Sequence, residues 1–316
     1  MKRKVIQIAD KTFVVSLPTE WVKRFNIAKG DELFLNNKDN DLVISQDSTP
    51  SAKTIRITIS GLEERVVRWY LSALHKAGYD EIEIVYEKNQ LSLIYELMKD
   101  LFTGFNTSAE TNSSITLKSI SSENKEDFNT ALRRAFRITL LMGKELIDYI
   151  MAINSRREVN NQTLNNIAEK ELLNNQLTNF CQRLINKYKF GGDKGTFLYA
   201  ILWNLEKVCD NYKYILNELN SEGKRTQVGS QKITISKEII EILEETNKYL
   251  EEYYELFYSY NLERLNKINL KTKQIKEKLN QIKPENQIDT KLLCRLSTLR
   301  VQITDFSASI IALNQK

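Results

Sequence analysis

The sequence predicts a mainly helical protein with a small β-rich region at its N-terminus. Glycine and proline are rare, with 10 and 3 among 316 residues, which disfavours turn-rich all-β folds. Alternation of apolar and polar residues, the period of a strand, is confined to the first 120 residues, whereas a helical period runs from Glu123 onward. A chain of this length can hold two or three domains, each with its own core.

Residues 1–47 predict a compact β, β, α, β, β domain. Strands are expected at residues 4–8 and 12–17, and Pro18 suits the first turn of a helix at residues 19–26, because its missing N–H needs no partner there. A turn at Gly30 and Asp31 leads to strands at residues 32–35 and 41–45. So small a domain buries little apolar surface alone, and we expect it to pair with a second copy. The apolar residues available for this pairing are Val5, Ile6, Val14, Val15 and Leu33.

Positive charge is concentrated at the N-terminus. The whole chain carries a formal net charge of +5, which alone is too mild to indicate a nucleic-acid-binding protein. Residues 1–30, however, contain seven basic side chains against two acidic ones, a net charge of +5 within this segment. Their positions in a compact domain favour contact with nucleic acid over a disordered charged tail. The basic residues are Lys2, Arg3, Lys4, Lys11, Lys23, Arg24 and Lys29.

A second domain is expected at residues 53–121, after a linker at residues 48–52. Strands at residues 54–59, 82–86 and 115–120 alternate with helices at residues 63–76 and 91–102, and Gly78 ends the first of these helices. The β-α-β-α-β order predicts a small open sheet with helices on one face.

From residue 123 to 316 the pattern is helical throughout. Six helices are expected, separated by breaks that include Gly191-Gly192, residues 221–230 and Pro284. The breaks divide the helices into two sets of three, at about residues 123–221 and 231–316. Two tandem three-helix bundles are therefore the predicted architecture of this half.

Several classes of protein are disfavoured. The single histidine, His75, excludes zinc sites built from several histidines, and its place near a helix end, where the helix dipole favours a cation, suggests a structural role. The three cysteines are far apart and are expected to be free thiols. No segment has the length and apolarity of a membrane helix or a signal peptide, so a cytoplasmic protein without membrane insertion is expected. No pairing of nucleophile and base appears, so no enzymatic activity is predicted.

The N-terminal domain resembles the swapped-hairpin SpoVT/AbrB-type DNA-binding domain. The resemblance lies in residues 3–35, and its hallmark is the run S-L-P-x-x-W, here Ser16 to Trp21, followed after a short helix by Lys29-Gly30-Asp31-Glu32. The resemblance implies a homodimer formed through this domain and bound to double-stranded DNA.

The rest of the chain is similar to archaeal PhoU-domain regulators of phosphate uptake. This resemblance rests on the middle segment Ala77-Gly78-Tyr79-Asp80-Glu81-Ile82 and on Asn204-Leu205-Glu206-Lys207-Val208-Cys209-Asp210, which is similar to the N-L-E-R-I-A-D stretch of PhoU repeats. It implies a DNA-binding transcriptional regulator of phosphate homeostasis. A second hypothesis also follows from it, namely an adaptor that does not bind DNA and acts by protein contact on a phosphate transporter ATPase or a kinase.

The same resemblance implies a metal site on the first bundle. Glu206 and Asp210 lie four residues apart on one helical face, and Glu171 on the preceding helix matches a third family carboxylate, while Asn175 replaces the expected aspartate. Such a set could hold a divalent or iron-type metal ion. The alternative is a solvated helical face without metal. The second bundle lacks comparable acidic pairs, since Lys271 and Ile275 occur where carboxylates might fall.

Overall fold

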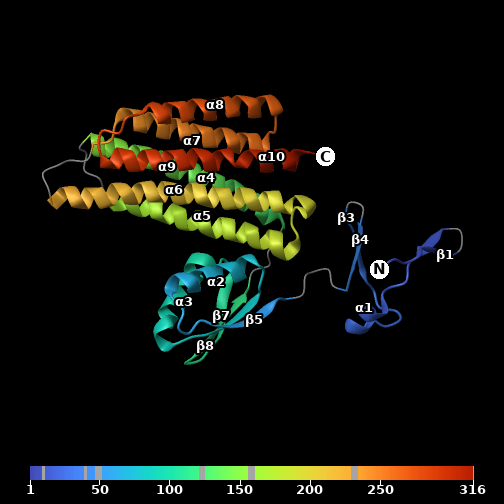
Figure 1. Cartoon of the computed structure of the whole chain (residues 1–316). Coiled ribbons are helices and arrows are strands. Elements are labelled where there is room, and N and C mark those ends of the chain that lie inside the picture. The colour runs from blue at the N-terminus through green and yellow to red at the C-terminus, as the bar shows by residue number, and fades with distance from the viewer. Residues whose placement is uncertain are drawn as a thin grey trace. The chain divides into compact units, whose positions relative to one another are not determined.

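The computed structural model describes residues 1–8, 11–38, 41–46, 52–120, 125–155, 161–228 and 234–315. The chain divides into two compact units, Met1–Ser51 and Ala52–Lys316, called unit 1 and unit 2 below (Figure 1). The predicted fold class is confirmed, with a small β-rich N-terminal region followed by a helical half.

Unit 1 consists of two short hairpins and one helix. Strands β1 (Ile6–Ile8) and β2 (Thr12–Val14) pair antiparallel, with Ile6 opposite Val14. Helix α1 (Thr19–Arg24) follows Pro18, whose carbonyl accepts the Val22 N–H at 3.0 Å. Strands β3 (Phe34–Lys38) and β4 (Asp41–Ser45) form the second hairpin. The predicted order is therefore found, although β3 begins two residues later than expected.

Unit 2 begins with a four-stranded mixed sheet. Its elements are β5 (Thr54–Thr58), α2 (Glu64–Lys76), β6 (Glu81–Val85), a short 3-10 helix (Lys88–Gln90), α3 (Leu91–Leu101), β7 (Phe105–Glu110) and β8 (Ser114–Ser119). The strand order is β5-β6-β8-β7, with β5 and β6 parallel and the other pairs antiparallel. The sequence pattern predicts β-α-β-α-β, with three strands, and does not predict β7. The expected order is therefore wrong, because the sheet has a fourth strand.

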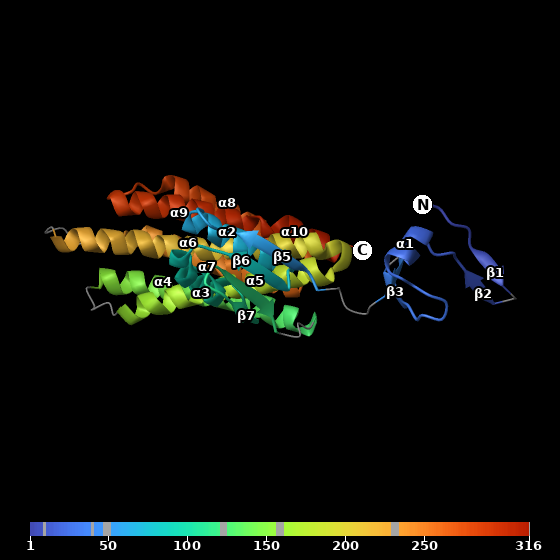
Figure 2. The ribbon, with the colours of Figure 1, turned by 90° about the horizontal axis from the view of Figure 1, so that it is seen from below.

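Both helices cover the same face of the sheet, as expected. Ile57, Ile82, Ile84 and Leu117 point from the strands into a core shared with α2 and α3. The opposite face carries polar pairs such as Arg56 with Glu83, whose side chains are 3.5 Å apart and exposed. The sheet, the two helices and the long helices beyond them form successive layers (Figures 1 and 2).

The helical half contains seven described helices. They are α4 (Lys125–Asn154), α5 (Asn161–Tyr188), α6 (Gly195–Val228), α7 (Lys237–Tyr258), α8 (Leu262–Gln281), α9 (Gln287–Thr304) and α10 (Phe306–Asn314). Two predictions need correction. Helix α6 continues through the break expected at residues 221–230 as far as Val228, and the single last helix is interrupted at Asp305.

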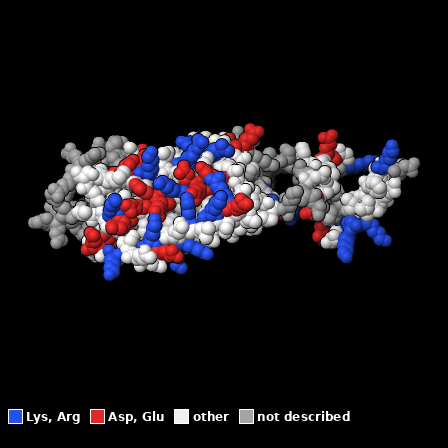
Figure 3. Space-filling model, turned by 90° about the horizontal axis from the view of Figure 1, so that it is seen from above, with Lys and Arg blue, Asp and Glu red and all other residues white. Residues whose placement is uncertain are grey.

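The two sets of helices, α4–α6 and α7–α10, share one hydrophobic core. The Tyr212 hydroxyl group of α6 links the two sets, because it donates a hydrogen bond to Asn247 Oδ1 of α7 at 3.0 Å. On the face seen in Figure 3, basic and acidic side chains alternate across the helical part, and ion pairs join α7 to α8. Within the described ranges, no helix has both the length and the apolarity that crossing a membrane requires.

Candidate functional site

The basic residues singled out in the sequence are all on the surface of unit 1. Each of the seven is exposed, and within the described residues none forms an ion pair with a carboxylate. Lys23 and Arg24 occupy the last turn of α1, where the helix dipole favours positive charge. Unneutralised cations on a compact domain are the groups that release counterions from a nucleic-acid backbone. Unit 1 thus presents the charge that an anionic partner requires.

The Lys-Gly-Asp-Glu segment, residues 29–32, forms a turn after α1 that requires its glycine and its aspartate. Gly30 has φ +100°, a conformation that side-chain-bearing residues rarely adopt. The Asp31 carboxylate accepts the Ala28 N–H at 2.8 Å, which fixes the turn. Lys29 precedes Gly30 in this turn and is exposed. The turn therefore fixes the backbone position of an exposed basic residue.

Unit 1 shows no buried core among its described residues. Among the residues of this unit whose exposure the structure describes, not one is buried. Most of its large apolar side chains face solvent, among them Val5, Ile6, Ile8, Phe13, Val15, Phe25, Phe34, Leu35, Leu42 and Val43. Val14 and Leu33, which are expected in the same set, are only half-buried. A domain of this size needs further apolar burial to be stable, so unit 1 needs a partner surface.

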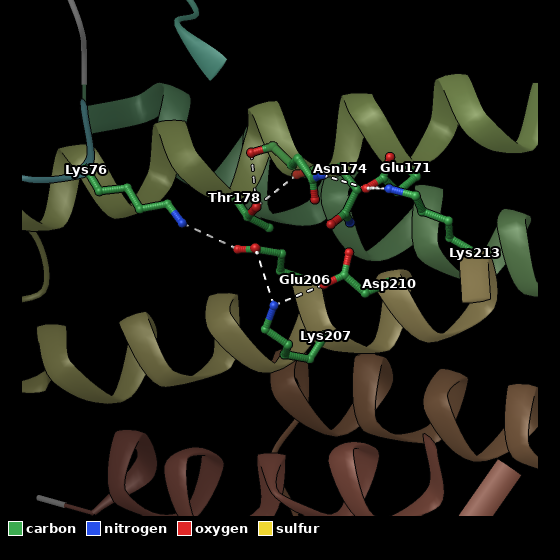
Figure 4. Close-up of polar contacts among 9 residues, drawn as sticks. Lys76, Glu171, Asn174, Thr178, Glu206, Lys207, Asp210 and Lys213 are labelled. Atoms are coloured by element: carbon green, nitrogen blue, oxygen red, sulfur yellow. Dashed lines mark hydrogen bonds and ion pairs between the residues drawn. The ribbon is translucent and has the colours of Figure 1, made fainter. Parts of the chain in front are cut away.

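The three carboxylates predicted to bind metal lie between α5 and α6, and each is paired with lysine (Figure 4). Lys213 Nζ is 2.8 Å from Glu171 Oε1. Lys207 Nζ is 3.0 Å from Asp210 Oδ2 and 3.7 Å from Glu206 Oε1, so one ammonium group lies between these two carboxylates. The carboxylates are not a solvated face, because the Glu206 and Asp210 side chains are only 16% and 15% exposed.

These ion pairs raise the pKa values of the two lysines. Burial lowers the pKa of Lys207, but its hydrogen bond to Asp210 and the nearby Glu206 charge outweigh this and raise the pKa above its usual value. Burial likewise lowers the pKa of Lys213, and the hydrogen bond and charge of Glu171 raise it to a net increase. Both lysines are therefore held in the charged form that neutralises the carboxylates.

Several buried polar atoms around this carboxylate group have no hydrogen-bond partner. Asn175 donates to Glu171 Oε1 at 2.8 Å, while its own Oδ1 accepts no hydrogen bond from a described residue. Glu206 Oε2 accepts no hydrogen bond from a described residue either, but it lies 3.6 Å from Lys76 Nζ, which pairs with it. Buried oxygen atoms of this kind usually bind water or an ion. Within the described part of the chain, however, no three residues of the His, Cys, Asp or Glu type are grouped as a metal site requires.

Asp80 joins the sheet to the helical half, a role that sequence reasoning missed. Its Oδ1 accepts hydrogen bonds from Arg183 Nη2 and Lys187 Nζ of α5, both at 2.6 Å, and its Oδ2 accepts the Lys53 N–H at 3.1 Å. Arg183 is fully buried and also donates to the Tyr79 carbonyl at 2.6 Å. Burial raises the pKa of Asp80, but the hydrogen bonds from Lys187 and Lys53 and the two cationic charges lower it below its usual range.

His75 is held neutral, contrary to the expectation of a cation favoured by the helix dipole. Its ring packs 5.2 Å from Phe102 and 5.6 Å from Phe105, and neither ring nitrogen has a partner among the described residues. Burial, assisted by the charges of Arg183 and Lys76, lowers the pKa of His75 from 6.5 to about 3. Loss of hydration outweighs the helix dipole here because the ring is wholly enclosed.

The comparisons with known proteins concern unit 1. The family model described as "Antidote-toxin recognition MazE, bacterial antitoxin" matches residues 6–55. No curated protein and no solved structure matches the chain significantly. The chain therefore contains a MazE/AbrB-type domain at its N-terminus, which agrees with the expected AbrB-type domain. The match ends at residue 55 and does not include the helical half.

Proposed function

We propose that the protein is a DNA-binding transcriptional regulator that contacts double-stranded DNA through unit 1. The observation that carries the proposal is the set of seven exposed basic side chains, without carboxylate partners among the described residues, on a MazE/AbrB-type domain. Lysine and arginine bind phosphate oxygens irrespective of base sequence, and their affinity falls with salt as counterions return to the DNA. Asparagine and glutamine, which can read bases, number six in this unit, against seven basic residues in its first thirty positions.

A homodimer formed through unit 1 is part of the proposal. Apolar side chains in the two hairpins face solvent, with Val5 68%, Phe13 67% and Leu35 61% exposed. A second copy of the same hairpins would supply the missing half of a core and would double the number of cations on one surface. Sedimentation of the full chain tests this. We expect a dimer at micromolar concentration, and a monomer would contradict the proposal.

The DNA contact is tested by a charge-removal variant. Replacing Arg3, Lys4, Lys11 and Arg24 with Ala should weaken binding on every duplex and flatten the dependence of affinity on salt. The log–log slope should fall by about 0.9 for each phosphate that the protein no longer neutralises. The matched control removes the same charge from exposed sites in unit 2, at Lys267, Lys273, Lys276 and Lys283. Equal affinities and slopes for the two variants would refute the assignment.

We further propose that the regulated process is phosphate uptake, with the helical half as the sensing or partner-docking part. Support comes only from the resemblance of residues 77–82 and 204–210 to archaeal PhoU-domain regulators. The alternative is an adaptor without DNA binding that contacts a phosphate transporter ATPase or a kinase. The matched family's description, which names recognition of a toxin, also concerns a protein partner. A salt-dependent gel shift on DNA upstream of the protein's own gene separates the two: a shift supports the regulator, and none supports the adaptor.

Metal binding by Glu171, Glu206 and Asp210 is also part of the proposal. The Asn175 oxygen that accepts no hydrogen bond supports it. An ion at Glu206 and Asp210 would have to displace the ammonium groups of Lys207 and Lys76, which pair with these carboxylates. Metal analysis of protein purified without chelator should give about one ion per chain, absent from the Glu206→Ala, Asp210→Ala variant. Near-zero metal in both proteins would contradict the site and assign these carboxylates to ion pairing alone.

A further inference from the structure

A surface pocket lies where helices α4, α7 and α8 meet. Its volume is about 330 Å³, at the lower end of the range of about 300–1,000 Å³ that small-molecule sites occupy. The end of α7 and the start of α8 supply most of its lining, and α4 contributes one residue. The lining residues are Arg133, Tyr254, Glu255, Tyr258, Ser259 and Arg264. This set, called the α4–α8 pocket below, combines two guanidinium groups with two phenol rings.

Arg133 carries a positive charge that no carboxylate among the described residues neutralises. It is exposed, and its guanidinium carbon lies 4.6 Å from the centre of the Tyr258 ring. Stacking on an aromatic face fixes the plane of a guanidinium group and leaves N–H donors along its edge for a two-point hydrogen bond to an oxyanion. Arg137, one turn further along α4, is also exposed and has no ion pair in the described part of the chain.

Arg264 is oriented by Glu255, with which it forms an ion pair through Nη2. A guanidinium group has five N–H donors, so this pair leaves others for a ligand, and the Arg264 side chain is 34% exposed. Its backbone lies in the first turn of α8, where Asn261 Oδ1 accepts the Arg264 N–H at 2.9 Å. The N–H groups of Leu262 and Glu263 have no acceptor within the helix. The positive end of the α8 dipole therefore lies beside Arg264.

The two tyrosines give the pocket aromatic walls that their neighbours hold in place. Tyr258 is 38% exposed, and its ring packs edge-on against Tyr254 and Phe257, with ring centres 5.1 and 4.9 Å apart. Tyr254 in turn packs 5.6 Å from Phe136. Burial raises the pKa of Tyr258 more than the hydrogen bond and charge of Arg133 lower it, so the phenol stays neutral beside an anion. An aromatic surface next to guanidinium groups suits a ligand that has a planar ring as well as negative charge.

The α4–α8 pocket keeps a positive charge after the nearby acidic groups are counted. Glu255 balances Arg264, and Glu263, in the first turn of α8, offsets part of the dipole of that helix. Arg133 remains, and Arg137 continues the positive charge along the exposed side of α4. A phosphate monoester, which carries about −1.5 to −2 charges at pH 7, is complementary to this arrangement.

We propose that the α4–α8 pocket binds a phosphate ester that carries a planar ring, of the class of a mononucleotide. The phosphate group accepts hydrogen bonds from Arg133 and from the first turn of α8, and the ring packs against Tyr254 and Tyr258. Inorganic phosphate would leave the aromatic walls without a contact, and a neutral ring would leave Arg133 without an anion. The ligand therefore needs both groups.

Isothermal titration calorimetry of the full chain tests this site. The probes are AMP, GMP, CMP and UMP, with ribose 5-phosphate and inorganic phosphate as ligands that lack the base. We expect at least one mononucleotide to bind with one site per chain, at least tenfold more tightly than either probe without a base. In Arg133→Ala this affinity should fall at least tenfold, because a hydrogen bond between two charged groups is lost. The matched control, Arg65→Ala, removes an exposed guanidinium group that lies 4.9 Å from the centre of the Trp69 ring outside the pocket, and it should bind as the wild type does.

Each other result contradicts a defined part of the proposal. No binding of any of the four mononucleotides at millimolar concentration would overturn it altogether. Equal affinities for a mononucleotide and for inorganic phosphate would overturn the contact with the ring. Equal losses of affinity in Arg133→Ala and Arg65→Ala would show that the nucleotide binds by charge alone and would overturn the assignment to this pocket. Because both arginine side chains are exposed, both variants should keep the Tm of the wild type.

Discussion

Replacing Asp80 with Asn should destabilise unit 2 strongly, because it removes the carboxylate that pairs with the fully buried guanidinium group of Arg183. The Arg183 side chain is 0% exposed and that of Asp80 is 14% exposed. Removing one partner of a buried pair costs about 3–5 kcal/mol. Arg183 keeps two backbone acceptors, the carbonyls of Tyr79 and His75, so we expect the lower end, about 3 kcal/mol. For a unit of this size that corresponds to a fall in Tm of roughly 6–12 °C.

Differential scanning calorimetry of the full chain measures this fall. The matched control is Glu83→Gln on the neighbouring strand position, because Glu83 pairs with the 70%-exposed Arg56 at 3.5 Å and such surface pairs contribute less than about 1 kcal/mol. The pKa of Asp80 is lowered in the folded state, so its contribution is present above the unfolded pKa and is lost as pH falls through the folded pKa. The difference in unfolding free energy between wild type and Asp80→Asn should therefore decrease as the pH is lowered. Equal losses of stability for the two variants at pH 7 would refute the reasoning.

Two further predictions concern buried positions of unit 2. His75 takes up a proton near pH 6.5 when unfolded but only near pH 3 when folded, so its contribution to stability should fall by about 2 kcal/mol between pH 7 and pH 5. Urea unfolding of the wild type should show this pH dependence of the unfolding free energy, and His75→Leu should lose it. An unchanged pH dependence in His75→Leu would contradict the burial of a neutral ring. In Gly143→Ala the new Cβ would collide with Asn247 Oδ1 and would lie 2.8 Å from Tyr212 Cζ. The variant should therefore lose about 1–3 kcal/mol of unfolding free energy, whereas an uncrowded helical Gly→Ala substitution gains about 1 kcal/mol. A raised Tm would show that helices α4, α6 and α7 move apart to accommodate the methyl group without loss of stability.

The order of elements could be predicted from the sequence because each period is a local property. The period-2 run at residues 54–59 and the helical spacing of residues 63–76 each reflect one buried face. Strand β7 could not be predicted because its sequence, Phe-Asn-Thr-Ser-Ala-Glu, has little apolar alternation. This strand lies at the edge of the sheet, contains an irregularity between Thr107 and Ala109, and is exposed over much of its length.

The junction at Asp80 could not be predicted because it depends on contacts between residues far apart in sequence. Arg183 and Lys187 follow Asp80 by more than one hundred residues, and helical spacing alone places neither beside it. Glycine is required at position 78 of the same segment because of the same contact with α5. Gly78 has φ +83°, and a Cβ there would lie 2.9 Å from Lys187 Cβ. The Ala-Gly-Tyr-Asp segment, which in the sequence carries only a resemblance, therefore has a physical role in docking the sheet onto α5.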